Sequence, residues 1–203
     1  PIGYLGARSG PIGASGPMNT RAEVVSSDAE LLILVDPEDR PLGTLDKGRC
    51  HDGEGRLHRA FSAFVFDADG RVLLQRRAEG KRLWGGYWSN SCCSHPRAGE
   101  ALEEAVRRRV AQELGLAFEP SYVYRFEYRA EFGDLGTEHE LCSVFVGRTT
   151  EQPTVNVTEV MDWRWIEPAE LDRELGERPE RYTPWLRMEW QRLRTEFADR
   201  LPA

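Results

Sequence analysis

The feature that most constrains the fold is one amphipathic segment set between two runs of short strand-like segments. Across residues 100–114 apolar side chains recur at helical spacing, and Gly115 follows where a C-terminal cap belongs. The repeating residues are Leu102, Ala105, Val106, Val110 and Leu114. The spacing predicts a helix over residues 100–114.

Short apolar or alternating segments bounded by turn residues predict strands on both sides of this helix. They cover residues 31–35, 42–45, 59–66 and 71–75 before it, and 122–131, 138–147 and 161–166 after it. Two more helices are expected near the C-terminus, the last beginning at Thr183-Pro184 and running to about Leu201. These elements predict an α+β domain in which helices pack on a mixed or antiparallel sheet.

The ends of the domain are expected from composition. Residues 1–25 are rich in Gly, Pro and Ser and lack apolar periodicity, so we expect a disordered tail or an added leader there. Residues 26–203 are then expected to form a single domain, since a chain of 203 residues with 40% hydrophobic content can build one sizeable core.

Charge and hydropathy exclude several classes of function. The net charge of −7 comes with no basic excess in any part of the chain, so we expect no nucleic-acid partner. No apolar run approaches the roughly 20 residues that span a bilayer, and no signal-peptide pattern occurs, so we expect no membrane partner and a cytoplasmic location. The four cysteines show no CxxC spacing, which favours reduced thiols over disulfides or a cysteine-based zinc site.

Three of the four histidines lie near other residue types that bind metals. His51 and His58 are seven residues apart, and His95 stands two residues after Cys93. Each histidine taken alone is more often a core or surface residue than a ligand. Their combination with nearby acids is what indicates a site.

The acids lie in Glu138-His139-Glu140, within a predicted strand, where alternation places Glu138 and Glu140 on one face. Partly buried carboxylates require a cation or a proton. Three imidazoles and two carboxylates suit a divalent metal such as manganese or zinc, and magnesium less well. The alternative is a hairpin whose acidic side chains simply face solvent.

The segment NSCCSHP (residues 90–96) follows WGGYW (residues 84–88), which offers aromatic walls and close approach of the backbone. A buried cysteine is usually a small hydrophobic residue. Cys93, however, neighbours a candidate metal ligand, where a cation would shift the thiol equilibrium.

Taken in order, these motifs resemble the type I isopentenyl diphosphate isomerases, and the resemblance spans roughly Leu42 to Trp185. It rests on GTLDK (residues 43–47), His51 with His58, NSCCSHP, the helix end Glu113-Leu114-Gly115, EHELC (residues 138–142) and YTPW (residues 182–185). The resemblance implies a Nudix-type α/β/α sandwich with a mixed sheet. It also implies an isoprenoid-biosynthesis enzyme that interconverts isopentenyl diphosphate and dimethylallyl diphosphate, with no obligatory protein partner.

The resemblance also implies residue roles. The residues that match ligands of one divalent metal, Mn²⁺, Mg²⁺ or Zn²⁺, are His51, His58, His95, Glu138 and Glu140. Glu113 matches a residue that helps to hold a Mg²⁺ ion that also contacts the substrate diphosphate. The cations expected on the diphosphate are Lys47, Arg77, Lys81 and Arg109, which suits an acidic protein that binds an anion locally.

Cys93 and Glu140 match the catalytic pair of that family, with Tyr128 beside the glutamate and Trp185 near the reacting carbons. Moving the double bond adds one proton and removes another through a tertiary carbocation, so two proton-carrying groups on opposite faces are needed. A thiol and a carboxylate fill these roles, and the sequence leaves open which is acid and which is base. An indole face stabilises such a cation by roughly 0.5–2 kcal/mol without trapping it.

Two alternatives remain at this point. A Nudix diphosphohydrolase would use the signature G-x5-E-x7-R-E-U-x-E-E-x-G-U, with U apolar. Here Ser94 replaces the first glycine, and Arg109 and Gln112 replace two acids. Loss of those acids weakens the magnesium cluster that would activate water. The other alternative is a structural metalloprotein, although structural zinc sites are usually four-coordinate and rich in cysteine.

Overall fold

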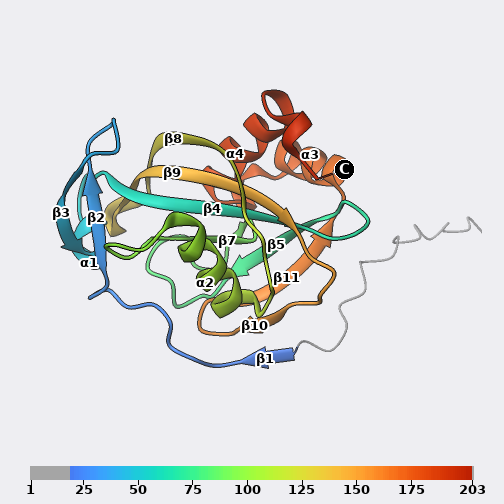
Figure 1. The fold of residues 1–203 in the computed structure, drawn as a ribbon, viewed down its shortest axis with the longest axis horizontal. Coiled ribbons are helices and arrows are strands. Elements are labelled where there is room, and N and C mark those ends of the chain that lie inside the picture. Colours follow the sequence, from blue (N-terminus) through green and yellow to red (C-terminus); the bar gives the residue numbers. More distant parts are fainter. Residues whose placement is uncertain (1–18, 203) are drawn as a thin grey trace, which may run out of the picture.

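The computed structural model describes residues 19–202, which form a mixed sheet between helices (Figure 1). The strands are β1 (Asn19–Arg21), β2 (Leu31–Val35), β3 (Pro41–Asp46), β4 (His58–Phe66), β5 (Val72–Arg77), β6 (Trp88–Ser89), β7 (Cys92–Ser94), β8 (Ser121–Glu131), β9 (Thr137–Arg148), β10 (Thr154–Asn156) and β11 (Val160–Ile166). The helices are α1 (Lys47–Cys50), α2 (Leu102–Leu114), α3 (Pro168–Glu177) and α4 (Pro184–Thr195), with 3-10 turns at Gly133–Leu135, Pro179–Arg181 and Ala198–Arg200.

The main sheet is built around β4, which pairs with β2, β5, β7 and β9. All of these pairings are antiparallel except β4 with β9, which is parallel and runs from His58↔Glu140 to Phe66↔Arg148. Strand β8 lies antiparallel to β9 on its other side. The parallel pair makes the sheet mixed and sets the first residue of β4 beside the acidic start of β9.

Helices cover both faces of this sheet, because β4 alternates between two cores. Phe61, Ala63 and Val65 pack in the same cluster as the buried face of α2. Phe64 and Phe66 pack on the opposite face in the cluster that includes residues of α3 and α4. The resulting α/β/α layering is visible in Figure 1, and it confirms the predicted α+β class with a mixed sheet.

The central helix ends where it was predicted to end but begins at Leu102, two residues later, whereas the last helix does not reach its predicted end. Helix α2 ends at Gly115, which has φ 67° and takes the left-handed cap conformation. Helix α4 stops at Thr195 rather than near Leu201. The chain turns there because Phe197 stacks on Tyr124, with ring centroids 4.7 Å apart, and a continuing helix would carry that ring away.

Four short strands, β1, β6, β7 and β10, were not predicted. Residues 1–18 of the expected tail lie outside the described residues, but Asn19–Arg21 form β1, which pairs in parallel with β10. Strands β6 and β7 have only two and three residues. Segments this short carry no measurable alternation, and their pairing depends on partners far away in the sequence.

None of the helices in residues 19–202 has both the length and the apolar character needed to cross a bilayer.

Candidate active site

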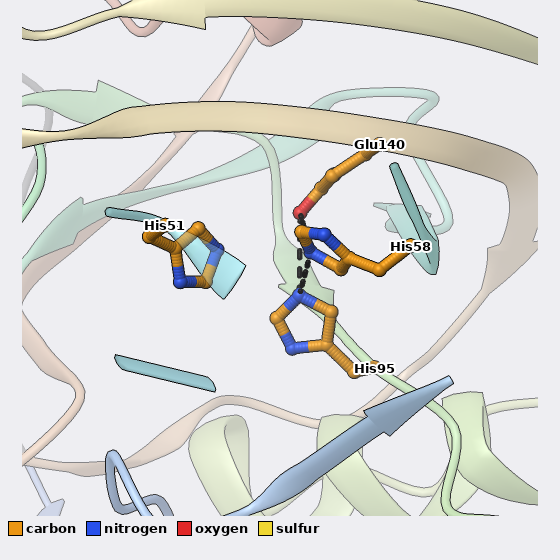
Figure 2. A group of neighbouring side chains, drawn as sticks. All are labelled: His51, His58, His95 and Glu140. Atoms are coloured by element: carbon orange, nitrogen blue, oxygen red, sulfur yellow. Dashed lines mark hydrogen bonds and ion pairs between the residues drawn. The ribbon is translucent and has the colours of Figure 1, made fainter. Parts of the chain in front are cut away.

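Four of the predicted metal ligands meet in one buried cluster. His51 caps α1, His58 begins β4, His95 follows β7 and Glu140 lies on β9. One ligand atom from each lies within 4.8 Å of all the others. Figure 2 shows Glu140, His58 and His95 joined by close contacts, with His51 beside them. The register of β4 with β9 makes this possible, because it pairs His58 directly with Glu140.

Backbone carbonyls fix the orientation of two of these imidazoles. His51 Nδ1 lies 2.8 Å from the Lys47 carbonyl oxygen, and His58 Nδ1 lies 2.7 Å from that of Arg56. A carbonyl oxygen only accepts, so Nδ1 carries the proton in both rings. In its neutral form each ring would therefore present the lone pair of Nε2 to the cluster, as metal-binding histidines do.

Glu138 reaches the cluster through His51. Its Oε2 lies 2.8 Å from His51 Nε2, but neither atom has a hydrogen bond with acceptable geometry, although both are buried. Burial opposes the charged forms of both groups. Their mutual attraction outweighs it, so the pKa of His51 is raised and that of Glu138 is lowered. Buried polar atoms without hydrogen-bond partners require explanation, and a divalent cation between these donors would supply it.

A glycine allows His51 to occupy this place. Gly136 has φ 145°, and a Cβ on it would lie 2.3 Å from the His51 carbonyl oxygen. The same carbonyl accepts a hydrogen bond from the Thr137 backbone N–H at 2.9 Å. The close approach ties the end of α1 to the start of β9, and only glycine fits there.

Cys93 lies beside the cluster with a neutral thiol. Burial, reinforced by nearby carboxylates, raises the pKa of Cys93 far above its ordinary value. Its Sγ lies 2.7 Å from Asn90 Oδ1 and 3.4 Å from Ser62 Oγ, and Trp185 Nε1 donates to it at 3.1 Å. These contacts hold the thiol in one position.

Glu140 has the opposite charge preference. Burial disfavours its ionised form, but the close imidazoles of His58 and His95, at 3.7 and 3.3 Å from Oε1, outweigh burial and hold the pKa of Glu140 well below its ordinary value. Tyr128 donates its hydroxyl proton to Glu140 Oε2 at 2.7 Å, and burial raises the pKa of that tyrosine. A neutral thiol and an ionised carboxylate therefore stand in one site, as proton transfer in two directions requires.

Aromatic rings close the site around these groups. Trp185 on α4 is 2% exposed, and the ring of Trp84 meets it edge-on at 5.2 Å. Tyr128 lies 6.3 Å from the same indole, and the Arg77 guanidinium lies 5.2 Å from its centroid. The predicted aromatic wall thus includes Trp84, whereas Trp88 of the same motif packs in the core under α3 and α4.

These groups line a cavity of about 250 Å³ that is also lined by cations. The predicted residues that border it are Lys47, His51, Arg77, Lys81, Cys93, His95, Arg109, Tyr128, Glu138, Glu140 and Trp185. His58 and Glu113 are not among the residues that line it. Burial, together with neighbouring cations, lowers the pKa of Lys47, as expected for positive charges gathered to meet an anion.

The helix that carries the degenerate hydrolase signature holds its charges in ion pairs. Arg109 donates to Glu113 Oε1 at 2.6 Å, and both side chains are almost completely buried. Glu100, a second signature acid, is bound by Arg108 at 2.6 Å. The arginine that replaces an acid therefore neutralises part of the carboxylate cluster that a hydrolase needs for its metal ions.

Sequence reasoning missed several residues at this site. Ser26 and Ser27 line the cavity, and Ser26 Oγ accepts from Lys47 Nζ at 2.8 Å. Glu159 also lines it and pairs with Lys81 and Arg109. All three lie in segments without periodicity, so only their spatial neighbours reveal them. Glu189, a fully buried acid on α4, is another residue that sequence reasoning missed.

Fold and site together define the class of protein. The NUDIX domain family model matches residues 56–186, which is most of the domain. The solved structure of DR0079 from Deinococcus radiodurans has the same fold, with a TM-score of 0.67 and 23% identity over 80% of this chain and 98% of that one.

Sequence comparison defines the family more narrowly. The chain is 49% identical to an isopentenyl-diphosphate Delta-isomerase of Burkholderia multivorans, over 77% of this chain and 88% of the relative. It is 41% identical to isopentenyl-diphosphate Delta-isomerase 1 of Photorhabdus laumondii, over 85% of this chain and 99% of the relative. The chain belongs to the isopentenyl-diphosphate Delta-isomerases of the NUDIX family, which confirms the resemblance seen in its motifs.

Proposed function

We propose that this enzyme interconverts isopentenyl diphosphate and dimethylallyl diphosphate, with Cys93 and Glu140 exchanging the two protons. The observation that carries the assignment is that a neutral thiol, an ionised carboxylate and five cationic side chains all line one cavity. The cations are the four predicted ones and Arg82. A cytosolic location, expected from the sequence, is part of this proposal.

The reaction needs one proton added at the terminal alkene carbon and one removed from the carbon next to the diphosphate-bearing carbon. Of Cys93 and Glu140, one delivers the first proton and the other accepts the second, and the return reaction exchanges their roles. The Tyr128 hydroxyl holds Glu140 in place and extends the proton path from it. Net proton count is unchanged over the reaction, so no co-reactant is consumed.

The tertiary cation between the two steps is met by the Trp185 indole. Its N–H is held by Ser89 Oγ at 3.0 Å and Cys93 Sγ at 3.1 Å, which fixes the ring beside the thiol. A π face attracts a cation but forms no bond with it. The surrounding aromatic side chains also exclude water that would otherwise capture the cation.

The diphosphate is held by Lys47, Arg77, Lys81 and Arg109. Glu113, behind Arg109, is the residue proposed to support a diphosphate-bound Mg²⁺. His51, His58, His95, Glu138 and Glu140 are proposed to hold a second divalent metal, Mn²⁺, Mg²⁺ or Zn²⁺. When bound, this metal supplies positive charge that keeps Glu140 oriented and modulates its acidity.

The test is incubation of the purified protein with isopentenyl diphosphate and Mg²⁺ in D2O. Dimethylallyl diphosphate, deuterium incorporation and released phosphate are measured together. We expect deuterated dimethylallyl product without phosphate release, and loss of that product in Cys93→Ala. The matched control is Cys50→Ala, since Cys50 is likewise a free cysteine but does not line the cavity.

Phosphate release without isomerisation would instead assign the hydrolase function. The ion pairing of Glu113 and Glu100 weighs against that outcome. Equal activity of Cys93→Ala and the wild type would refute the catalytic role of the thiol. A structural metal site alone would give neither product.

A further inference from the structure

Glu189 is a buried acid that the proposed mechanism does not use. It lies on α4, is 0% exposed, and its Oε2 has no hydrogen-bond partner. Among residues 19–202 no lysine, arginine or histidine lies within ion-pair distance of it. A buried carboxylate without a cation is costly, so the physical environment favours the protonated acid.

Its protonation differs from that of the other buried acids of the site. Burial, with a contribution from ionised Glu140, raises the pKa of Glu189 to about 8, and the nearby polar groups of Ser62 and Cys142 oppose this only in part. By contrast, the pKa values of Glu113, Glu138 and Glu140 are held below the ordinary range.

A line of close contacts connects Glu189 to the catalytic thiol. Glu189 Oε1 lies 3.5 Å from Cys142 Sγ, which lies 3.5 Å from Ser62 Oγ. Ser62 Oγ in turn lies 3.4 Å from Cys93 Sγ. Every member is buried or nearly so, and no water is needed to complete the line.

Counting protons gives this line a direction. Cys142 has one S–H, so it cannot donate to both Ser62 and Glu189. If Glu189 carries a proton, it donates to Cys142, Cys142 donates to Ser62, and Ser62 donates to Cys93. The Cys93 S–H then donates to Asn90 Oδ1 at 2.7 Å. Each group donates once, and every contact is a hydrogen bond.

Loss of the Glu189 proton breaks this order. The carboxylate becomes an acceptor, Cys142 turns its S–H toward it, and Ser62 loses its donor. The Ser62 hydroxyl is then free to turn toward Cys142 Sγ, and Cys93 loses a hydrogen bond while an anion appears near it. Hydrogen bonds in a buried network depend on one another, so a change at one end is felt at the other.

The other titratable groups that face Glu189 keep their charge through the same pH range. They are Glu140 and Cys142 on β9, Cys93 on β7, and Tyr124 and Tyr128 on β8. Burial raises the pKa values of the two thiols and the two phenols, so they stay neutral. Glu140 stays ionised.

We propose that Glu189 is a positioning residue whose proton orients the chain Glu189–Cys142–Ser62–Cys93, so that isomerisation is lost when Glu189 ionises. The inference rests on the proposed function, because it acts on the thiol assigned there to proton transfer.

The experiment measures kcat and KM from about pH 6 to about pH 9.5 in wild type, Glu189→Gln and Glu196→Gln. Glutamine donates an N–H as the protonated acid does but cannot ionise. Glu196 is the matched control, an exposed glutamate just after the same helix that pairs with Arg192. We expect wild-type kcat to fall as the pH passes about 8, by about tenfold for one further pH unit, with Glu196→Gln behaving likewise. Glu189→Gln is expected to hold its kcat.

An equal alkaline fall in Glu189→Gln, or no fall in the wild type, would overturn the inference. An alkaline effect confined to a rise in KM would also overturn it, because deprotonation of Lys47, which is proposed to bind the diphosphate, would produce that behaviour. Ser62→Ala removes the hydroxyl that connects Cys142 to Cys93. We expect this variant to have a lower kcat that no longer falls at alkaline pH, and an unchanged KM.

Infrared spectroscopy of the wild type tests whether Glu189 is protonated, without any substrate or variant. We expect a protonated-carboxyl band at neutral pH that disappears as the pH passes about 8. A spectrum without that band overturns the inference. Absence of isomerase activity at every pH would refute the proposed function instead, and the infrared result would still decide the state of Glu189.

Discussion

Replacing Glu174 by glutamine removes the carboxylate that holds together the approach to α4. Arg164 on β11 donates to Glu174 through its two terminal guanidinium nitrogens, at 3.1 and 2.9 Å. Tyr182 donates its hydroxyl proton to the same carboxylate. The backbone N–H of the next residue, Thr183, donates to the Trp88 carbonyl at 2.9 Å, immediately before the helix that carries Trp185. The group therefore fixes where α4 begins.

The size of the effect follows from the protonation of Glu174. Burial opposes ionisation, but the hydrogen bonds from Arg164 and Tyr182 outweigh it and lower the pKa of Glu174 from 4.5 to about 2. At about 1.4 kcal/mol per pKa unit, this lowering of the pKa sets an upper bound of roughly 3 kcal/mol on what the ionised Glu174 contributes to the free energy of unfolding. The Arg164 side chain is 32% exposed, so solvent screening reduces the expected stabilisation to about 1–2 kcal/mol.

The sign of the pH dependence is fixed by the lowered pKa. The stabilisation is fully present above about pH 4.5 and is lost as the pH falls through about 2. Glu174→Gln is therefore expected to be about 1–2 kcal/mol less stable than wild type at neutral pH, with the difference shrinking between these two values.

Urea unfolding at a series of pH values measures this difference. The matched control is Glu177→Gln on the same helix. Glu177 pairs with Arg173, whose side chain is 54% exposed, so this substitution should lower the free energy of unfolding by less than about 0.5 kcal/mol. A Glu174→Gln protein as stable as wild type at neutral pH, or a difference that does not change on acidification, would refute the reasoning.

Other perturbations test the remaining parts of the structure. Gly136→Ala should displace His51 and reduce bound divalent metal measured by elemental analysis, whereas Gly176→Ala, whose Cβ would meet nothing within 4 Å, should bind metal as wild type does. Leu186→Ala, at a fully buried α4 position, should lower the free energy of unfolding by about 2–5 kcal/mol in denaturant titrations, and a loss below 1 kcal/mol would show that α4 is loosely packed. Lys81→Met should raise KM about tenfold or more with little change in kcat, and an unchanged KM in steady-state assays would remove Lys81 from the diphosphate site. Removing metal with a chelator should lower the melting temperature and abolish turnover, both restored by adding divalent metal, and an unchanged melting temperature would contradict a metal within the His/Glu cluster.

The local elements were readable from the sequence because their signals are local. The spacing from Leu102 to Leu114 and the αL position of Gly115 define α2 without reference to any other part of the chain. Alternation placed Glu138 and Glu140 on one face of β9, while His139 points the other way and bonds to Glu127 at 2.9 Å. The end of α4 was predicted wrongly because a distant ring, Tyr124, decides where the chain turns.

The candidate site was partly predictable for a different reason. Motifs such as NSCCSHP and EHELC identified residue types whose chemistry is unusual wherever they lie, and the resemblance to the family added Lys47 and Trp185 as expected site residues. Ser26 and Glu159 have no such signal. They belong to the site because they lie against Lys47 and Lys81 in space.

The sequence by itself determined the class of fold, the family and the set of side chains able to carry the chemistry. The tertiary structure alone decided their states. It sets His58 beside Glu140 through a parallel strand pair, binds Arg109 to Glu113, and buries Glu189 with no cation from residues 19–202 within ion-pair distance. The physical reason is that residue type and periodicity are properties of a local segment. Burial and charge pairing depend instead on the distance to groups that the chain brings together only when it folds.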